Sequence, residues 1–156
     1  MATWQSQVDS LINIRNDVMI EIRTDLQIVD WEALRQDLIT DNFHNGRTTA
    51  QLRLSFENST HVAMGFDGSR CIANGRMLSD GVGNAYVIDV WTLSAYRRQG
   101  LGRKIMQMLV DAVPGQHIYL QTDDAITFYE ELGFTRQPEG MSRISGAYLQ
   151  NTSKIR

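Results

Sequence analysis

The fold of this chain is decided by residues 87–104, which read Val87-Ile-Asp-Val-Trp-Thr-Leu-Ser-Ala-Tyr-Arg-Arg-Gln-Gly-Leu-Gly-Arg-Lys104. The first six residues are β-branched, aromatic or apolar except for Asp89, which is typical of a mostly buried strand. The apolar residues that follow share one face of a helix: Leu101, Ile105, Met108, Leu109 and Ala112. The stretch therefore predicts a strand, a glycine-containing turn and a helix that ends near Pro114.

The turn between that strand and that helix has the composition of an anion site. The first N–H groups of a helix lack internal partners and lie at the positive end of its dipole, and Gly100 and Gly102 let an anion approach them. Four of the fifteen Lys and Arg residues gather here: Arg97, Arg98, Arg103 and Lys104. A phosphate site is one reading, and a solvated basic helix start is the other. Ile105 replaces the third glycine of a dinucleotide fingerprint, and the Gly-Lys-Ser/Thr of a P-loop is absent.

Composition limits the remaining function classes. With 156 residues, 42% apolar residues and no low-complexity tract, the chain is expected to form one domain in the cytoplasm. A net charge of -3 argues against nucleic acid, and no apolar run predicts a membrane span. The single cysteine, Cys71, lies in an apolar run and is expected in the core, and the three histidines have no ligand spacing. We expect no metal.

The N-terminal residues 1–17 are expected to form a helical extension of a domain spanning 18–150, with 151–156 as a flexible tail. Trp4, Val8, Leu11 and Ile12 have helical spacing. This apolar stripe is expected to pack on the domain's own sheet, and the alternatives are a lid or a homodimer contact.

The rest of the chain predicts a mixed sheet. A strand over 18–24 precedes helices that begin after Asp30 and near Thr48. Two Asp-Gly turns, at Asp67 and Asp80, separate three strands of an antiparallel meander that ends in the opening stretch. The helix after Gly100 and a strand over 117–121 form a right-handed parallel crossover. A helix over about 124–132, with Gly133 as its left-handed cap, then precedes final strands over 134–136 and 143–148.

Two motifs in this order resemble those of the GCN5-related N-acetyltransferase (GNAT) family. Residues 97–102, Arg-Arg-Gln-Gly-Leu-Gly, are similar to the family's Arg/Gln-x-x-Gly-x-Gly/Ala turn, and residues 125–134, Ala-Ile-Thr-Phe-Tyr-Glu-Glu-Leu-Gly-Phe, are similar to its Ala-x-x-x-Tyr-x-x-x-Gly-Phe helix. The resemblance implies a GNAT-like α/β (α+β) fold: a mixed, mostly antiparallel sheet of six to seven strands flanked by about four helices. It also implies acetyl-coenzyme A (acetyl-CoA) wedged between the fourth and fifth strands of the family fold.

The same resemblance assigns roles to individual residues. The backbone of Trp91 and Thr92 would pair with the pantetheine arm, and Thr122 stands where many members carry an Asn that contacts the coenzyme. The pyrophosphate would be held by the stretch Arg97, Arg98, Gln99, Gly100, Leu101, Gly102 and Arg103. Ser94 departs from the family in standing where Pro is common.

Tyr129 would be the general acid that protonates the departing thiolate, since its phenol and a thiol are similarly basic. The alternative is a core aromatic. Asp89 would bind the substrate ammonium or accept its proton; the alternative is a carboxylate tied to nearby backbone or to Arg76. Trp31, Phe43 and Trp91 are candidates to line the amine pocket.

These expectations predict an N-acetyltransferase that transfers acetyl from acetyl-CoA to a small-molecule or peptide amine by direct attack in a ternary complex. The alternative function is a non-catalytic acyl-CoA-binding or interaction module on the same scaffold.

Overall fold

The computed structural model of the chain describes residues 10–14 and 18–149 and contains one mixed sheet. The six strands lie in sequence order: β1 (Ser10–Ile14), β2 (Val18–Arg23), β3 (His61–Asp67), β4 (Arg70–Ser79), β5 (Asn84–Thr92) and β6 (His117–Tyr119). Neighbouring strands pair antiparallel from β1 to β5, and β6 pairs parallel with β5. The predicted mostly antiparallel sheet with one parallel crossover is confirmed.

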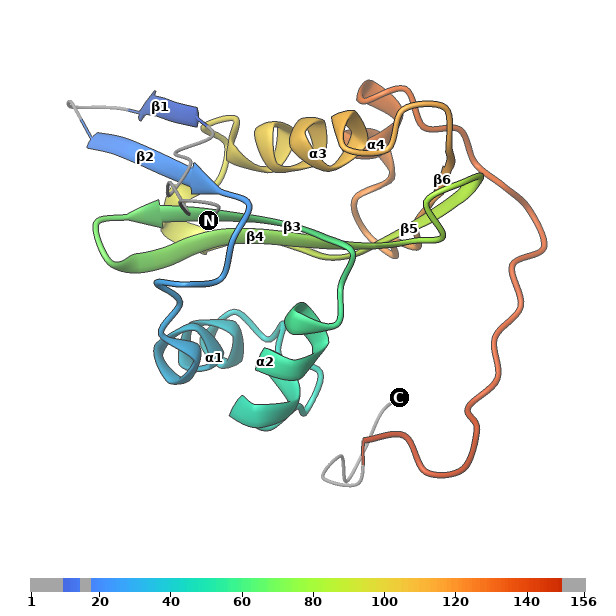
Figure 1. The fold of residues 1–156 in the computed structure, drawn as a ribbon, viewed down its shortest axis with the longest axis horizontal. Helices are drawn as coiled ribbons and strands as arrows, with labels where there is room; N and C mark the ends of the chain where they lie inside the picture. Colours follow the sequence, from blue (N-terminus) through green and yellow to red (C-terminus); the bar gives the residue numbers. More distant parts are fainter. Residues whose placement is uncertain (1–9, 15–17, 150–156) are drawn as a thin grey trace, which may run out of the picture.

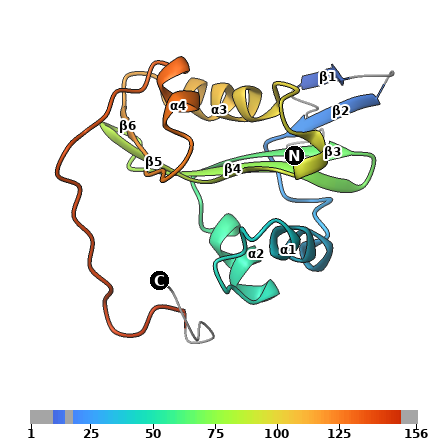
Figure 2. The ribbon, with the colours of Figure 1, turned by 180° about the vertical axis from the view of Figure 1, so that it is seen from behind.

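Four α-helices cover the two faces of this sheet: α1 (Trp31–Thr40), α2 (Thr49–Glu57), α3 (Leu101–Asp111) and α4 (Ile126–Glu131). Figure 1 shows α1 and α2 on one face and α3 and α4 on the other, and Figure 2 shows the same two layers from behind. Within the described ranges, no helix is long and apolar enough to cross a membrane.

The predicted helix starts on the first face are confirmed by their caps. Asp30 Oδ1 accepts a hydrogen bond from the Ala33 N–H at 3.0 Å, where α1 begins. Thr48 and Gln51 form a reciprocal capping box at the start of α2, in which each side chain accepts from the other residue's N–H. The inward residues of these helices are fully buried: Leu34, Leu38, Leu52 and Phe56. The caps and the apolar faces together fix this layer on the sheet.

A glycine sets the distance between α3 and the sheet on the other face. A Cβ placed on Gly75 of β4 would lie 2.7 Å from Ile105 Cγ2 and 3.1 Å from Leu109 Cδ1. No larger residue fits there without moving α3, so the backbone of β4 and the helix are in direct contact.

The parallel pair of strands separates soon after it forms. Only Asn84 to Tyr86 of β5 pair with β6, whereas β5 continues to Thr92. The β5 edge over 87–92 therefore has no neighbouring strand on that side within the described residues, and such an edge leaves main-chain hydrogen-bonding groups for a ligand.

The predicted N-terminal helix is wrong over residues 10–14, and residues 1–9 and 15–17 lie outside the described part of the chain. Residues 10–14 form β1, which pairs with β2 in a register that opposes Ile12 to Ile20 and Ile14 to Val18. Ile14 is buried and Leu11 is 60% exposed. The alternation of Ile12 and Ile14 and an available strand edge outweighed the helical spacing of Leu11 and Ile12.

The C-terminal part also differs from the prediction. No strand is present over 134–136 or 143–148 among the described residues, where the chain runs along the outside of the molecule (Figure 1). These residues are mostly exposed and bury no apolar face that would fix them as strands. The strand β6 ends at Tyr119, two residues before the predicted end, and α4 begins later than predicted. Gly133 does have the predicted left-handed conformation, with φ +88°.

Candidate functional site

The turn from β5 into α3 leaves main-chain donors without helical partners. Gly100 is exposed and left-handed (φ +85°), and a Cβ there would meet no atom within 4 Å. The first helical hydrogen bond runs from the Lys104 N–H to the Gly100 carbonyl at 3.1 Å. The amides of residues 101–103 therefore precede the hydrogen-bonded turns of α3, at the positive end of its dipole, where they can bind an anion.

The cationic side chains of this turn divide into two groups. Arg98 and Arg103 are exposed, and Arg103 makes only an exposed ion pair with Glu131 at 3.4 Å. Arg97 is as exposed as Arg103, but its Nε donates to the Thr92 carbonyl at 2.9 Å and its Nη2 to Asp41 at 3.2 Å. Gln99 donates to the Ala95 carbonyl at 3.5 Å. Arg98 and Arg103 can add charge at the anion site, while Arg97 holds the turn against β5.

Asp41, which sequence reasoning missed, organises this turn from the end of α1. Its Oδ2 accepts hydrogen bonds from Trp91 Nε1 at 3.0 Å and from the Ser94 N–H at 3.1 Å, and its Oδ1 accepts from the Ser94 hydroxyl. Burial opposes ionisation of this carboxyl, but the hydrogen bonds from Ser94 and Trp91 and the charge of Arg97 outweigh it and lower its pKa. Asp41 is an ordinary polar residue in the sequence, so no pattern could have indicated this role.

The two sequence motifs meet through an aromatic contact. A Cβ on Gly102 would lie 3.4 Å from the ring of Phe128, so α4 packs against the first turn of α3. Phe128 packs edge-on against Tyr129, with ring centroids 5.0 Å apart, and Tyr129 packs similarly on Phe134 at 5.9 Å. The glycine-containing turn and the predicted catalytic helix are thus neighbours in space.

The Tyr129 side chain, the predicted general acid, lies on α4. It is half-buried. Burial, with a smaller contribution from the charge of Asp124, raises its pKa above the ordinary value for tyrosine. The phenol is therefore protonated at neutral pH and can donate a proton.

Tyr129 lines a cleft of about 800 Å³ between β6, α4 and the chain that follows α4. Thr122 also lines it, and its hydroxyl accepts a hydrogen bond from the Ala125 N–H at 3.0 Å. The predicted coenzyme contact of Thr122 therefore competes with a hydrogen bond in the turn that precedes α4.

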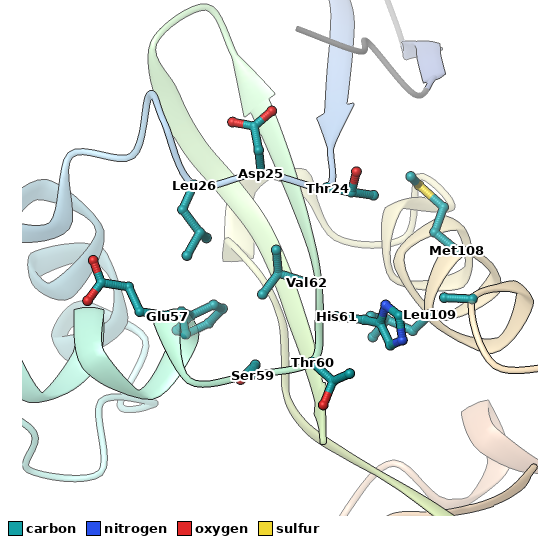
Figure 3. A pocket seen from close by; sticks show the side chains of 12 residues that line it. Thr24, Asp25, Leu26, Glu57, Ser59, Thr60, His61, Val62, Met108 and Leu109 are labelled. Carbon is teal, nitrogen blue, oxygen red and sulfur yellow. The ribbon is translucent and has the colours of Figure 1, made fainter. Parts of the chain in front are cut away.

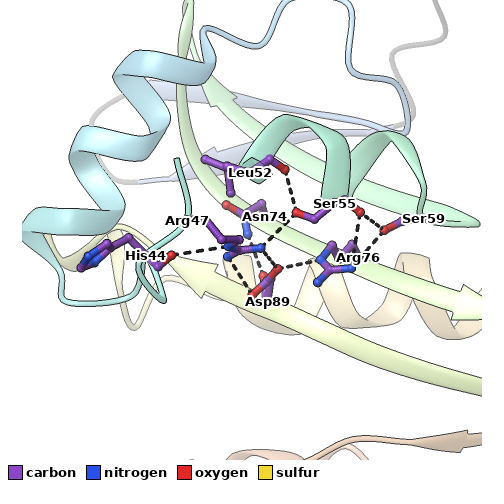
Figure 4. A network of polar contacts seen from close by, with 8 residues as sticks. All are labelled: His44, Arg47, Leu52, Ser55, Ser59, Asn74, Arg76 and Asp89. Carbon is purple, nitrogen blue, oxygen red and sulfur yellow. Dashed lines mark hydrogen bonds and ion pairs between the residues drawn. The ribbon is translucent and has the colours of Figure 1, made fainter. Parts of the chain in front are cut away.

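Asp89 lies at a β-bulge, where the register of β4 and β5 shifts between Asn74 and Arg76. Its carboxylate binds two guanidinium groups, from Arg47 at 2.7 and 3.2 Å and from Arg76 at 2.6 Å (Figure 4). The Asp89 side chain is 4% exposed and that of Arg47 is 7% exposed. The contact with Arg76 matches the alternative given for Asp89, a carboxylate held by a neighbouring side chain. Arg47 is a second partner, which the sequence did not indicate.

The aromatic residues predicted for the amine pocket are not gathered in one cavity. Trp31 packs against Phe56 of α2, with ring centroids 5.6 Å apart, and Trp91 is buried with its Nε1 on Asp41. Phe43 is half-buried against the core in the loop between α1 and α2. None of the three lines the cleft beside Tyr129, and their role in an amine pocket stays a prediction.

A second cavity of about 320 Å³ lies between the end of β2, the start of β3, α2 and α3 (Figure 3). It contains none of the predicted site residues. The described residues include no group of three His, Cys, Asp or Glu side chains placed to hold a metal ion. Cys71 is buried, as expected, and burial raises the pKa of its thiol to about 12.

Comparison with known proteins shows which family has this arrangement. The model of the acetyltransferase (GNAT) family matches residues 18–134, and the chain belongs to that family. A GNAT-family protein from Xanthomonas campestris superposes with a TM-score of 0.69 at 25% identity, covering 81% of this chain and 93% of that one. A structure from Deinococcus radiodurans has a TM-score of 0.70 at 22% identity over 80% and 87% of the two chains, and it shows the fold alone.

Curated relatives of the chain are named as acetyltransferases. A histone acetyltransferase, TAP1, from Glycine max is 30% identical over 70% of this chain, which spans 44% of that protein's length. The chloroplastic serotonin N-acetyltransferase 2 of Oryza sativa is 33% identical over 69% of this chain and 60% of its own length. The chloroplastic GCN5-related N-acetyltransferase 1 of Arabidopsis thaliana is 28% identical over 68% of each chain. The relatives support an acyltransferase activity.

Proposed function

We propose that the protein is an N-acetyltransferase that transfers the acetyl group of acetyl-CoA directly to a primary amine in a ternary complex. One observation carries the proposal: the unpaired β5 edge over 87–92 is followed, after the turn over 93–100, by the free amides of residues 101–103. An extended ligand with a pyrophosphate at one end fits this path, because β5 offers main-chain hydrogen bonds and α3 offers an anion site.

In the proposed reaction, the amine nitrogen bonds to the acetyl carbon while the carbon–sulfur bond of the thioester breaks. A main-chain amide near Trp91 stabilises the negative charge on the carbonyl oxygen. Tyr129 gives its proton to the departing sulfur, and the proton released by the new ammonium goes to water. We assign no base role to Asp89, because Arg47 and Arg76 already bind its carboxylate.

A melting experiment with acetyl-CoA tests the binding half of the proposal. A ligand at 100 times its dissociation constant adds about 2.7 kcal/mol of stability, which raises the melting temperature visibly. ATP at the same concentration is the control for a general polyanion effect. No shift with acetyl-CoA would reject the proposed coenzyme site.

A thiol-release screen tests the chemical half. We would offer amino sugars, polyamines, amino acids and peptide N-termini, and the names of the relatives add serotonin and a histone peptide. Release of coenzyme A that depends on one class of amine supports the enzyme. Binding of acetyl-CoA without release for any amine would favour the non-catalytic acyl-CoA-binding module. The cytoplasmic location and the homodimer stay predictions.

A further inference from the structure

We propose that the loop joining α1 to α2 holds the β-bulge of β5 in its active geometry, with Arg47 as a positioning residue. The loop, residues 41–48, is attached to β5 on both sides of the segment that would bind the thioester. Asp41 binds Trp91 and the turn after β5, and Arg47 binds Asp89. This inference rests on the proposed function, because it concerns the amides that would bind the acetyl group.

The bulge needs such support because its backbone is strained. Asp89 has φ +57°, a left-handed conformation that is unfavourable for a residue with a side chain inside a strand. Strained conformations of this kind persist only when the surrounding contacts over-determine them. The bulge also turns the amides of Val90 and Trp91 relative to a regular strand, so its geometry determines where those donors point.

Three side chains from two parts of the chain, the α1–α2 loop and β4, hold this one residue. Arg47 from the loop and Arg76 from β4 bind the carboxylate, and Asn74 Nδ2 donates to the Asp89 carbonyl at 2.6 Å. Figure 4 shows the two guanidinium groups meeting at Asp89. Asn74 is 1% exposed and Arg76 also reaches the Ser55 carbonyl and the Ser59 hydroxyl, each at 3.4 Å. Both the side chain and the main chain of Asp89 are thereby fixed.

Arg47 is the member of this group that links it to the loop. Its Nη1 also binds Ser55 Oγ at 3.0 Å, its Nε binds the His44 carbonyl at 3.4 Å, and its own carbonyl accepts from Arg35 Nε at 2.7 Å. A movement of the loop therefore moves the guanidinium that holds Asp89. An amine that orders this loop would also order the amides that polarise the thioester.

The test compares Arg47→Gln with Arg53→Gln, an arginine of α2 whose ion pair with Glu57 is largely exposed. Hydrogen exchange would be measured on peptides covering β5, and kcat and the acetyl-CoA Kd would be measured on the same proteins. For Arg47→Gln we expect exchange in β5 to rise about ten-fold or more and kcat to fall about 10- to 100-fold, with Kd within about two-fold. For Arg53→Gln we expect no change in β5 exchange, kcat or Kd.

Arg47→Lys separates positioning from simple loss of stability. Lysine restores the positive charge beside Asp89 but not the paired hydrogen bonds, so kcat should lie between those of the wild type and Arg47→Gln. Unchanged β5 exchange together with unchanged kcat in Arg47→Gln would overturn the inference. If Arg47→Gln does not fold, the β5 exchange and kcat of Arg47→Lys are compared with those of the wild type instead. If wild-type protein binds no acetyl-CoA, the proposed function fails, and the exchange experiment still decides whether the loop holds the bulge.

Discussion

The N-terminal turn of α3 and the bulge of β5 are separated by only a few residues, yet they treat charge in opposite ways. At the turn, Arg98 and Arg103 are exposed and the helix amides have no helical partners. At the bulge, a buried carboxylate is enclosed by two guanidinium groups. The open region therefore suits the external anion that we propose it binds, whereas the ion pairs of the closed region fix the shape of the strand.

The largest effect is expected from a substitution in the closed region, the bulge of β5. Asp89→Ala leaves the buried guanidinium groups of Arg47 and Arg76 without their carboxylate, and breaking such a pair costs about 3–5 kcal/mol. Urea unfolding should show this loss. The matched control is Glu57→Ala, which removes the exposed partner of Arg53 and should cost less than about 1 kcal/mol. Equal small losses in the two variants would show that the bulge needs no ionic support.

The next largest effect is expected from a substitution in the open region, the N-terminal turn of α3. Gly100→Glu puts a carboxylate in front of the free amides of α3, and we expect acetyl-CoA affinity to fall by about 100-fold or more, measured by calorimetry. Gly115→Glu is the control, because Gly115 is also left-handed (φ +80°) and open but lies beyond the other end of α3. An equal loss in both variants would show that strain or net charge, rather than the anion site, explains the result.

Tyr129→Phe tests the chemical step alone, because it leaves both the bulge of β5 and the turn of α3 unchanged. It removes the hydroxyl and keeps the ring that packs on Phe128 and Phe134, so folding and acetyl-CoA binding should be preserved. General-acid catalysis contributes about 10²- to 10⁴-fold, and we expect kcat at pH 7 to fall by about ten-fold or more. Tyr86→Phe, where β5 and β6 are still paired, is the control. Full turnover with chemistry rate-limiting would remove Tyr129 from the mechanism.

The smallest effect is expected in the pH profile. Because burial and Asp124 raise the pKa of Tyr129, the acid form persists through neutral and moderately alkaline pH. The value of kcat should therefore fall only above about pH 10, the ordinary pKa of tyrosine. Asp124→Asn should move this fall to slightly lower pH. A fall that starts below pH 9 in the wild type would contradict the role of Tyr129.

Helix caps and turns could be predicted from the sequence, because they depend on neighbouring residues. The helix caps at Asp30 and Thr48, the Asp-Gly turns and the glycine-containing turn at Gly100 each follow from neighbouring residues. Asp89 could be singled out because a carboxylate in an apolar strand is costly to bury unless it is paired. Arg76 could be named as a partner of Asp89, but Arg47 could not, since it is 42 residues away in a polar loop. The contact between Asp41 and Trp91, which are 50 residues apart, escaped prediction for the same reason.

The wrong predictions have a related cause. Residues 10–14 carry both a helical and an alternating apolar pattern, and only the presence of the β2 edge decides between them. The predicted final strands have strand-like residues, but no neighbouring strand pairs with them among the described residues. Strand formation depends on an available partner strand, and a local residue pattern does not show whether one is present.

The buried Cys71 makes the chain well suited to the measurements proposed above. It is the only cysteine of the protein, it is 5% exposed, and its Sγ lies 3.4 Å from the Ala73 carbonyl. Thiol reagents react with the thiolate, which a pKa of about 12 makes scarce at assay pH. A reagent that titrates released coenzyme A should therefore give no background from the folded protein, and slow labelling of Cys71 would report how often the core opens.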